Sequence, residues 1–95
     1  MIVGLNTTVG SEGEAQSMAR AALQAGLCAC VHLEQIQSLY RWKGVLCEEH
    51  EVRVLFKTTE TRRQRLEALI RSLHSYEQPA IWSVRFDTVD TSYAA

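Results

Sequence analysis

The feature that most constrains the fold of this chain is a pair of long extended stretches joined by two turn residues. Residues 28–42 and 45–58 have period-two character and are rich in β-branched and aromatic residues, which is typical of strands. Lys43 and Gly44 between them suit a tight turn. In the second stretch, Val52, Val54 and Phe56 share one face. The sequence therefore predicts a β-hairpin that is unusually long for 95 residues.

A helix is predicted before this hairpin. Ser11 and Glu14 have the spacing of a capping box, in which an N-cap serine and a glutamate three residues later open a helix. Gly26 suits the position just past a helix end. Between them, apolar residues recur at helical spacing and predict one buried stripe: Ala15, Met18, Ala19, Ala22 and Leu23.

A second helix is predicted after the hairpin, and two further strands lie at the ends of the chain. The second helix follows Thr59, and its apolar stripe comprises Leu66, Leu69, Ile70 and Leu73. Residues 1–9 are β-rich, and residues 80–86, which follow the single proline, Pro79, indicate a final strand.

The predicted order is strand, helix, strand, strand, helix, strand. This order is that of an α+β, ferredoxin-like βαββαβ fold, with two helices on one face of a four-stranded antiparallel sheet. We expect residues 1–95 to form one such domain. The other face of the sheet has no cover within the chain. Because this face and the hairpin carry large apolar residues, we expect a subunit contact there that includes Leu39, Tyr40 and Trp42.

Charge and cysteine content restrict the class of protein. Ten basic and eleven acidic residues give a net charge of −1, which does not favour nucleic acid or an anionic membrane as a partner. No apolar run is long enough to span a bilayer, and residues 1–10 lack the basic region of a signal peptide. Three cysteines do not suggest a disulfide framework, so we expect a reducing, cytoplasmic location.

Several short strings, in order and spacing, resemble the CutA family of divalent-cation tolerance proteins. The resemblance covers roughly residues 3–86. The family shows an A-C-V run, a Y-x-W-x-G turn, a K-T pair and an H-P-Y-E-x-P-E-I segment. This chain has the corresponding strings at Ala29–Val31, Tyr40–Gly44, Lys57–Thr58 and His74–Ile81.

The resemblance implies a homotrimer similar to the PII signalling proteins, and a role in tolerance of divalent cations, copper especially. It implies no enzymatic activity and no certain cofactor beyond a cation or small ligand bound in clefts between subunits. The alternative is a PII-like regulatory module that binds a protein partner without metal. By match, the cleft would contain Tyr40, Trp42, Lys57 and Tyr76, and the metal ligands would be Cys30, His74 and Glu77.

The chain departs from the family pattern at several positions. Lys43 and Ala80 replace residues that are usually acidic, and Ser75 replaces a proline. His32 stands where the family usually has asparagine, and the closing segment is shortened to Tyr93–Ala95. The loss of two acidic positions weakens the case for an intact cation site.

The candidate ligands also have ordinary structural interpretations. Cys28, Cys30, His32 and Glu34 alternate along one predicted strand and would share a face, and thiolate and imidazole suit copper or zinc. Cysteine is equally a common core residue. His74 follows a helix end, where it could complement the helix dipole instead of lining a cleft.

Chemistry beyond binding has little support in the sequence. A basic cluster at the start of the second helix is either a solvated face or an anion-attracting site; it comprises Arg62, Arg63 and Arg65. The chain has no G-x-S-x-G, no H-E-x-x-H, no phosphate loop and no dinucleotide turn. We therefore expect a binding protein.

Overall fold

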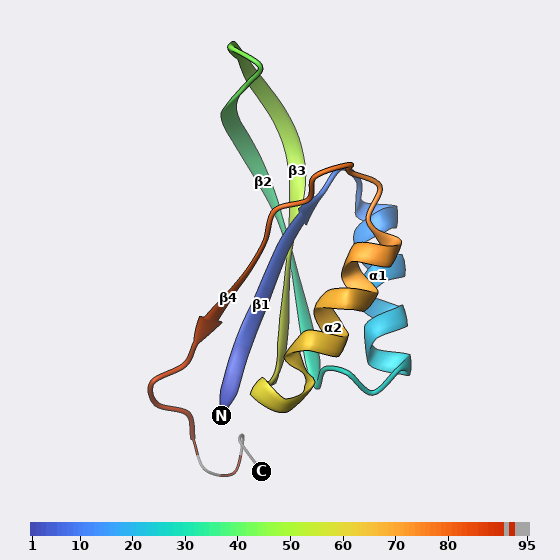
Figure 1. Cartoon of the computed structure of the whole chain (residues 1–95), viewed down its shortest axis with the longest axis vertical. Coiled ribbons are helices and arrows are strands. Elements are labelled where there is room, and N and C mark those ends of the chain that lie inside the picture. The colour runs from blue at the N-terminus through green and yellow to red at the C-terminus, as the bar shows by residue number, and fades with distance from the viewer. Residues whose placement is uncertain (91, 93–95) are drawn as a thin grey trace.

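The computed structural model describes residues 1–90 and 92, and the shortened closing segment at Tyr93–Ala95 lies outside the described residues. The predicted order of elements is confirmed, with both helices on one face of the sheet (Figure 1). Neither helix of the described part has the length and apolar composition that a bilayer crossing requires. The elements are β1 (Ile2–Val9), α1 (Glu12–Gln24), β2 (Cys30–Trp42), β3 (Val45–Thr59), α2 (Glu60–Leu73) and β4 (Ile81–Arg85).

The sheet has the order β2-β3-β1-β4, and its strands are antiparallel. β2 and β3 pair along their whole length, from Cys30 opposite Lys57 to Trp42 opposite Val45. β1 reaches β3 only as far as Val52, which lies opposite Val9. Residues 45–51 of β3 and their partners in β2 therefore project beyond the sheet, and Figure 1 shows this part of the hairpin standing clear of the helices.

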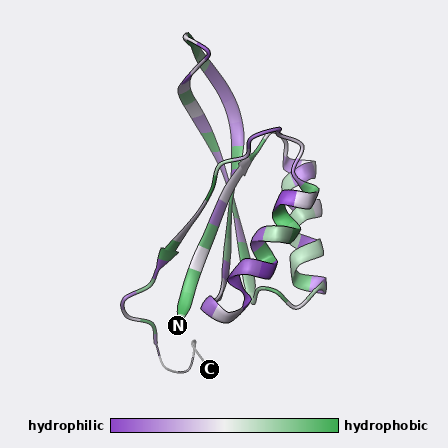
Figure 2. Ribbon diagram, in the orientation of Figure 1, coloured by the Kyte–Doolittle hydropathy of each residue, from purple (hydrophilic) through white to green (hydrophobic). Residues whose placement is uncertain are grey.

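The two residues of the hairpin turn both have positive φ, which a two-residue connection between twisted strands favours. Lys43 has φ of 50° and Gly44 has φ of 80°. Two successive residues of this kind are typical of a type I′ turn, whose twist matches that of the flanking strands. Along the projecting strands, hydrophobic and hydrophilic residues are interspersed (Figure 2), and because the neighbours Leu39 and Tyr40 point to opposite faces, each face of the hairpin carries some large apolar side chains.

The core lies between the sheet and the helices. β3 contributes Val52, Val54 and Phe56, as predicted, and α2 contributes Leu66 and Ile70. From α1, the buried residues are Ala15, Met18, Ala19 and Ala22. Each predicted apolar stripe included one residue that is not buried: Leu23 of α1 is 44% exposed and Leu73 of α2 is 43% exposed. Both lie near the C-terminal ends of their helices.

The ends of α1 follow the predicted chemistry. The hydroxyl of Ser11 accepts a hydrogen bond from the backbone N–H of Glu14 at 3.1 Å. At the other end, Gly26 has φ of 70°, and Leu27 N–H donates to the carbonyl of Ala22 at 3.1 Å. This 6→1 bond after a left-handed glycine is a Schellman motif, which satisfies carbonyls that the helix leaves free.

Candidate functional site

A groove of about 870 Å³ lies where the projecting hairpin meets the loop between α2 and β4. Its walls carry four aromatic side chains, those of Tyr40, Trp42, Tyr76 and Trp82. They also carry three carboxylates, those of Glu49, Glu51 and Glu77. Among the described residues that line it there is no lysine, arginine or histidine. The groove is therefore both acidic and aromatic.

The register of the hairpin explains how one wall is built. Glu49 lies opposite Ser38, and Glu51 lies opposite Ile36. Tyr40 lies opposite Cys47, two residues further toward the turn. Directly paired residues in an antiparallel sheet point to the same face, and every second residue repeats that face. These side chains therefore share the face of the hairpin that continues the uncovered side of the sheet.

Tyr76 joins the loop to this wall. Its hydroxyl donates a hydrogen bond of 2.6 Å to Oε2 of Glu51. Burial raises the pKa of Tyr76 far above its ordinary value, and the hydrogen bond and negative charge of Glu51 raise it further. The phenol therefore stays protonated and keeps donating throughout the physiological range. The contact fixes both the ring and the carboxylate at the edge of the groove.

Tyr40 has a similar relation to the next carboxylate along β3. Loss of hydration raises the pKa of the Tyr40 hydroxyl, and its hydrogen bond and proximity to Glu49 raise the pKa further. The hydroxyl of Tyr76 thus orients the Glu51 carboxylate, and the hydroxyl of Tyr40 lies close to Glu49 on the same strand. Because a carboxylate accepts several hydrogen bonds, each glutamate keeps acceptor sites free for a ligand.

His74 holds the loop against the end of β1. Its side chain is fully buried, and Nδ1 accepts a hydrogen bond from the backbone N–H of Tyr76 at 3.1 Å. The proton of the ring therefore lies on Nε2, which is 2.9 Å from the carbonyl oxygen of Thr8 and 3.1 Å from the hydroxyl of Thr7. That hydroxyl donates to the carbonyl of Ala80 at 2.8 Å. Both ring nitrogens are thus committed within the chain.

Glu14 fastens the same loop to α1. In a full capping box the glutamate side chain bonds back to the N-cap backbone N–H, whereas the Glu14 carboxylate bonds the loop. Oε2 accepts from the backbone N–H of Ser75 at 3.0 Å, and Oε1 accepts from the Ser75 hydroxyl at 2.9 Å. Ser75, which replaces a proline of the family pattern, supplies both donors, whereas proline would supply neither.

The structure does not bring the three predicted metal ligands together. Cys30 pairs with Lys57 at the start of β2, at the opposite end of the sheet from His74. Glu77 is exposed in the loop. Within the described part of the chain, no group of three His, Cys, Asp or Glu side chains is placed to hold a metal ion. The described residues of one chain therefore do not by themselves form a metal site, and the ligand set stays a prediction.

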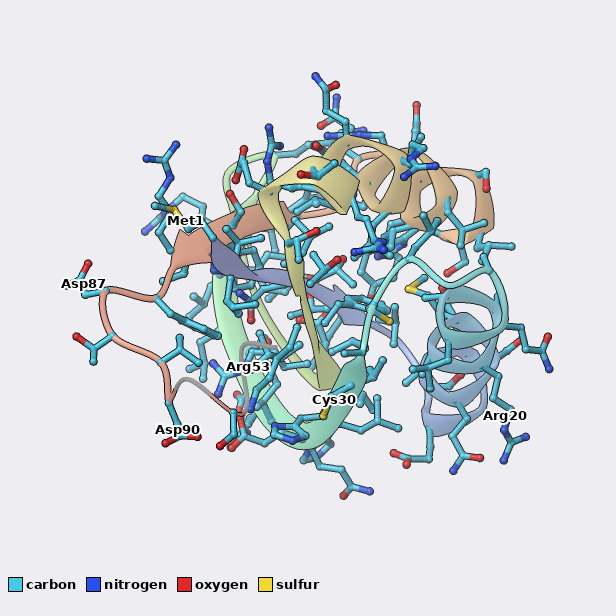
Figure 3. The ribbon with its side chains drawn as sticks, turned by 90° about the horizontal axis from the view of Figure 1, so that it is seen from below. Met1, Arg20, Cys30, Arg53, Asp87 and Asp90 are labelled. Atoms are coloured by element: carbon cyan, nitrogen blue, oxygen red, sulfur yellow. The ribbon has the colours of Figure 1, made fainter. Side chains whose placement is uncertain are left out.

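Cys28 does not share a face with Cys30, His32 and Glu34, contrary to the predicted alternation. It precedes β2 and packs against the core together with Val31. Its thiol has a raised pKa because burial removes water, and Cys30 adds to the effect. The strand alternation begins only at Cys30, the first residue of β2, which is labelled in Figure 3. The core interpretation therefore applies to Cys28.

The other predicted residues are placed as follows. Tyr40, Trp42 and Tyr76 line one groove, as expected for a cleft, but Lys57 lies outside it, opposite Gly4 and Cys30. Trp42 and Leu39 are exposed, as an interface would require. Among the charged and aromatic residues of the groove, the prediction missed Glu49, Glu51 and Trp82. A signal for two of them exists, since Glu49 and Glu51 fall at period two in the predicted hairpin.

The basic cluster of α2 is partly neutralised. Arg63 forms ion pairs with Glu60 and Glu67, and Arg71 also reaches Glu67. Arg62 donates to the hydroxyl of Thr59 at 3.5 Å. These contacts account for the cluster largely as a solvated helix face.

Comparison with known proteins agrees with this fold. The family model described as CutA1 divalent ion tolerance protein matches residues 3–95. The divalent-cation tolerance protein CutA of Thermotoga maritima is 37% identical over 87 residues, which are 92% of this chain and 86% of that protein. The solved structure of CutA from Synechococcus elongatus PCC7942 has a TM-score of 0.95 at 39% identity, covering 98% of this chain and 83% of that chain.

A second similar structure is described as the periplasmic divalent cation tolerance protein CutA from Archaeoglobus fulgidus. It has a TM-score of 0.95 at 25% identity and covers 98% of this chain and 91% of that chain. The match of a family model along nearly the whole sequence, the identity to curated relatives and the shared fold lead to one conclusion: the chain belongs to the CutA1 divalent ion tolerance protein family.

Proposed function

We propose that this protein is a homotrimer that binds a cation or small ligand in clefts between its subunits, each cleft having the acidic and aromatic groove as one wall. The observation that carries the assembly is the projecting hairpin. Leu39 is 63% exposed, Trp42 is 49% exposed and Leu46 is 70% exposed. Large apolar residues gathered on one projecting element are typical of a protein interface.

Unpaired strand edges support the same proposal. β2 is the outer strand of the sheet, so one side of its 13 residues has no strand partner within the described part of the chain. In the described structure, residues 45–51 of β3 also have no strand partner on the side that faces away from β2. A long open edge offers N–H and C=O groups for pairing with another chain. A second copy would satisfy these groups and cover the apolar side chains together.

A divalent cation is the ligand that the names of the relatives suggest, since they are described as divalent-cation tolerance proteins, and copper is the cation that the family resemblance implies. Because the described residues of one chain hold no group of three metal-ligating side chains, we propose that a metal site in this protein uses residues from two subunits. Cys30 and Glu77 have the exposure for such a shared site, whereas His74 is buried with both nitrogens engaged. We therefore keep Cys30 and Glu77 as proposed ligands and assign His74 to positioning of the loop.

The absence of a three-ligand group among the described residues also favours a second candidate function. A PII-like regulatory module would hold a protein partner or small molecule on its trimer surface without a metal, and it needs no three-ligand group. Neither candidate involves catalysis. We also propose a cytoplasmic location, from the cysteine content, although one similar protein is described as periplasmic.

Sedimentation velocity at micromolar concentration tests the assembly. The native chain should sediment as a trimer, and Leu39→Ser combined with Trp42→Ser should shift it toward monomer. Leu23→Ser, which changes an exposed apolar residue of α1, should leave the trimer intact and serves as the control. A monomeric native protein would refute the proposal.

Calorimetric titration with Cu²⁺ separates the two candidate functions. Saturable binding that is weakened by Cys30→Ser favours the cation site. Absence of binding to a correctly assembled trimer favours the metal-free module.

A further inference from the structure

We propose that the groove binds a linear aliphatic polyamine. The inference rests on the proposed function, because it names the class of ligand for the same cleft wall. It starts from the balance of charge: the groove presents the carboxylates of Glu49, Glu51 and Glu77, and its described lining includes no basic side chain. Such a surface attracts cations and repels anions.

The spacing of the carboxylates favours a ligand with several separated charges. Glu49 and Glu51 are two residues apart on one face of β3, so their backbone positions are about 7 Å apart. Glu77 adds a third carboxylate from the loop. A chain of ammonium groups joined by methylene segments could reach separate carboxylates in sequence, whereas a compact cation could reach only one or two.

The aromatic walls suit the methylene segments and the ammonium groups alike. The rings of Tyr40, Trp42, Tyr76 and Trp82 present apolar surface, against which methylene groups can pack. An ammonium group within about 6 Å of a ring centroid is attracted by the π-electrons. The chain already has one such contact, since Nζ of Lys43 lies 5.7 Å from the ring centroid of Trp42. This ring therefore accepts an alkylammonium group.

The geometry is less suitable for a bare metal ion. One carboxylate oxygen of Glu51 already accepts a hydrogen bond from the hydroxyl of Tyr76. Among the described residues, no three acidic, cysteine or histidine side chains are placed to hold a metal ion. A groove of about 870 Å³ is also far larger than an ion requires. An extended organic cation can lie along such a groove and does not need convergent ligands.

Isothermal titration calorimetry with spermidine at low ionic strength tests this inference. Hexane-1,6-diol, which has methylene groups but no charge, is the matched neutral probe. We expect saturable spermidine binding and no diol binding. The double variant Glu49→Gln and Glu77→Gln should bind about tenfold more weakly, because two charge contacts are lost. Trp82→Leu should weaken binding roughly three- to thirtyfold.

The control variant carries Glu60→Gln and Asp87→Asn, which remove the same charge at the other end of the sheet and should bind like the native chain. Circular dichroism confirms that each variant is folded. Equal binding of the diol, equal binding by the double variant, or no saturable binding of spermidine would overturn the inference.

Sedimentation of the same samples separates this inference from the proposed trimer, because one chain supplies all the lining residues. A trimer that does not bind spermidine overturns the inference alone. A monomer that binds it supports the inference and overturns the trimer.

Discussion

Replacing His74 by alanine tests whether this histidine positions the loop or binds a ligand. The buried ring makes hydrogen bonds to Tyr76 N–H and to the Thr8 carbonyl. Removing it leaves both groups without their partners. An unsatisfied buried polar group costs about 1–3 kcal/mol. Because both partners are only part-buried, water can replace some of the loss. The expected loss of unfolding free energy is therefore about 2–4 kcal/mol.

Urea unfolding followed by tryptophan fluorescence at one fixed chain concentration measures this change, since assembly would make the midpoint depend on concentration. In a domain of this size, the same loss lowers Tm by roughly 10–30 °C. His74→Gln should recover part of the stability, because the glutamine amide can donate near the position of Nε2. His50→Ala, at an exposed position of β3, should change the free energy by less than about 0.5 kcal/mol.

The reasoning would be wrong if His74→Ala had the same urea midpoint as the native chain and lost affinity for a metal ion. That result would mean that the ring is free to coordinate and that its hydrogen bonds contribute little. Equal stability of the alanine and glutamine variants, both well below native, would instead contradict the specific role given to the Nε2–H bond.

Three further changes test the core, a helix end and the groove. Phe56→Ala should lower the unfolding free energy by about 3–5 kcal/mol in urea titrations, because the ring is fully buried; a loss below 1 kcal/mol would contradict its central position. Gly26→Ala should cost about 1 kcal/mol since φ is +70°, whereas Gly13→Ala, in the open first turn of α1, should gain up to about 1 kcal/mol. The raised pKa of Tyr76 means that the folded state favours the protonated phenol. The resulting contribution to the free energy of unfolding is complete below pH 10 and is lost as the pH rises beyond that value. Tyr76→Phe should therefore flatten the alkaline decline in urea stability, and an unchanged decline would refute this assignment.

The order of elements and most of their limits were predictable because their signals are local. The N-cap of Ser11, the left-handed Gly26 and the two-residue turn at Lys43 each act within a few residues of the chain. Period-two and helical patterns likewise report which side chains face the core. Leu23 and Leu73 were misassigned because the extent of a buried stripe depends on what lies beside the helix, which the pattern does not contain.

The candidate site was only partly predictable. Tyr40 and Trp42 were singled out as aromatic residues of an exposed hairpin, and the structure places them in the groove with Tyr76. Lys57 was included through the family pattern, yet the register moves it to the other end of the sheet. Trp82 was predicted only as part of a strand, and nothing nearby in the sequence indicates that it lines a groove together with hairpin residues.

By itself, the sequence determined a βαββαβ fold with a long hairpin, because periodicity, caps and turns are set by neighbouring residues. Only the tertiary structure decided what the polar residues do. Tyr76 meets Glu51 across 25 positions of sequence, and His74 meets Thr7 across 67. Such contacts depend on strand register and on the path of the loop between α2 and β4. The physical reason is that burial and partner choice, which made His74 a buried support and the three glutamates an acidic groove, arise from packing between distant segments.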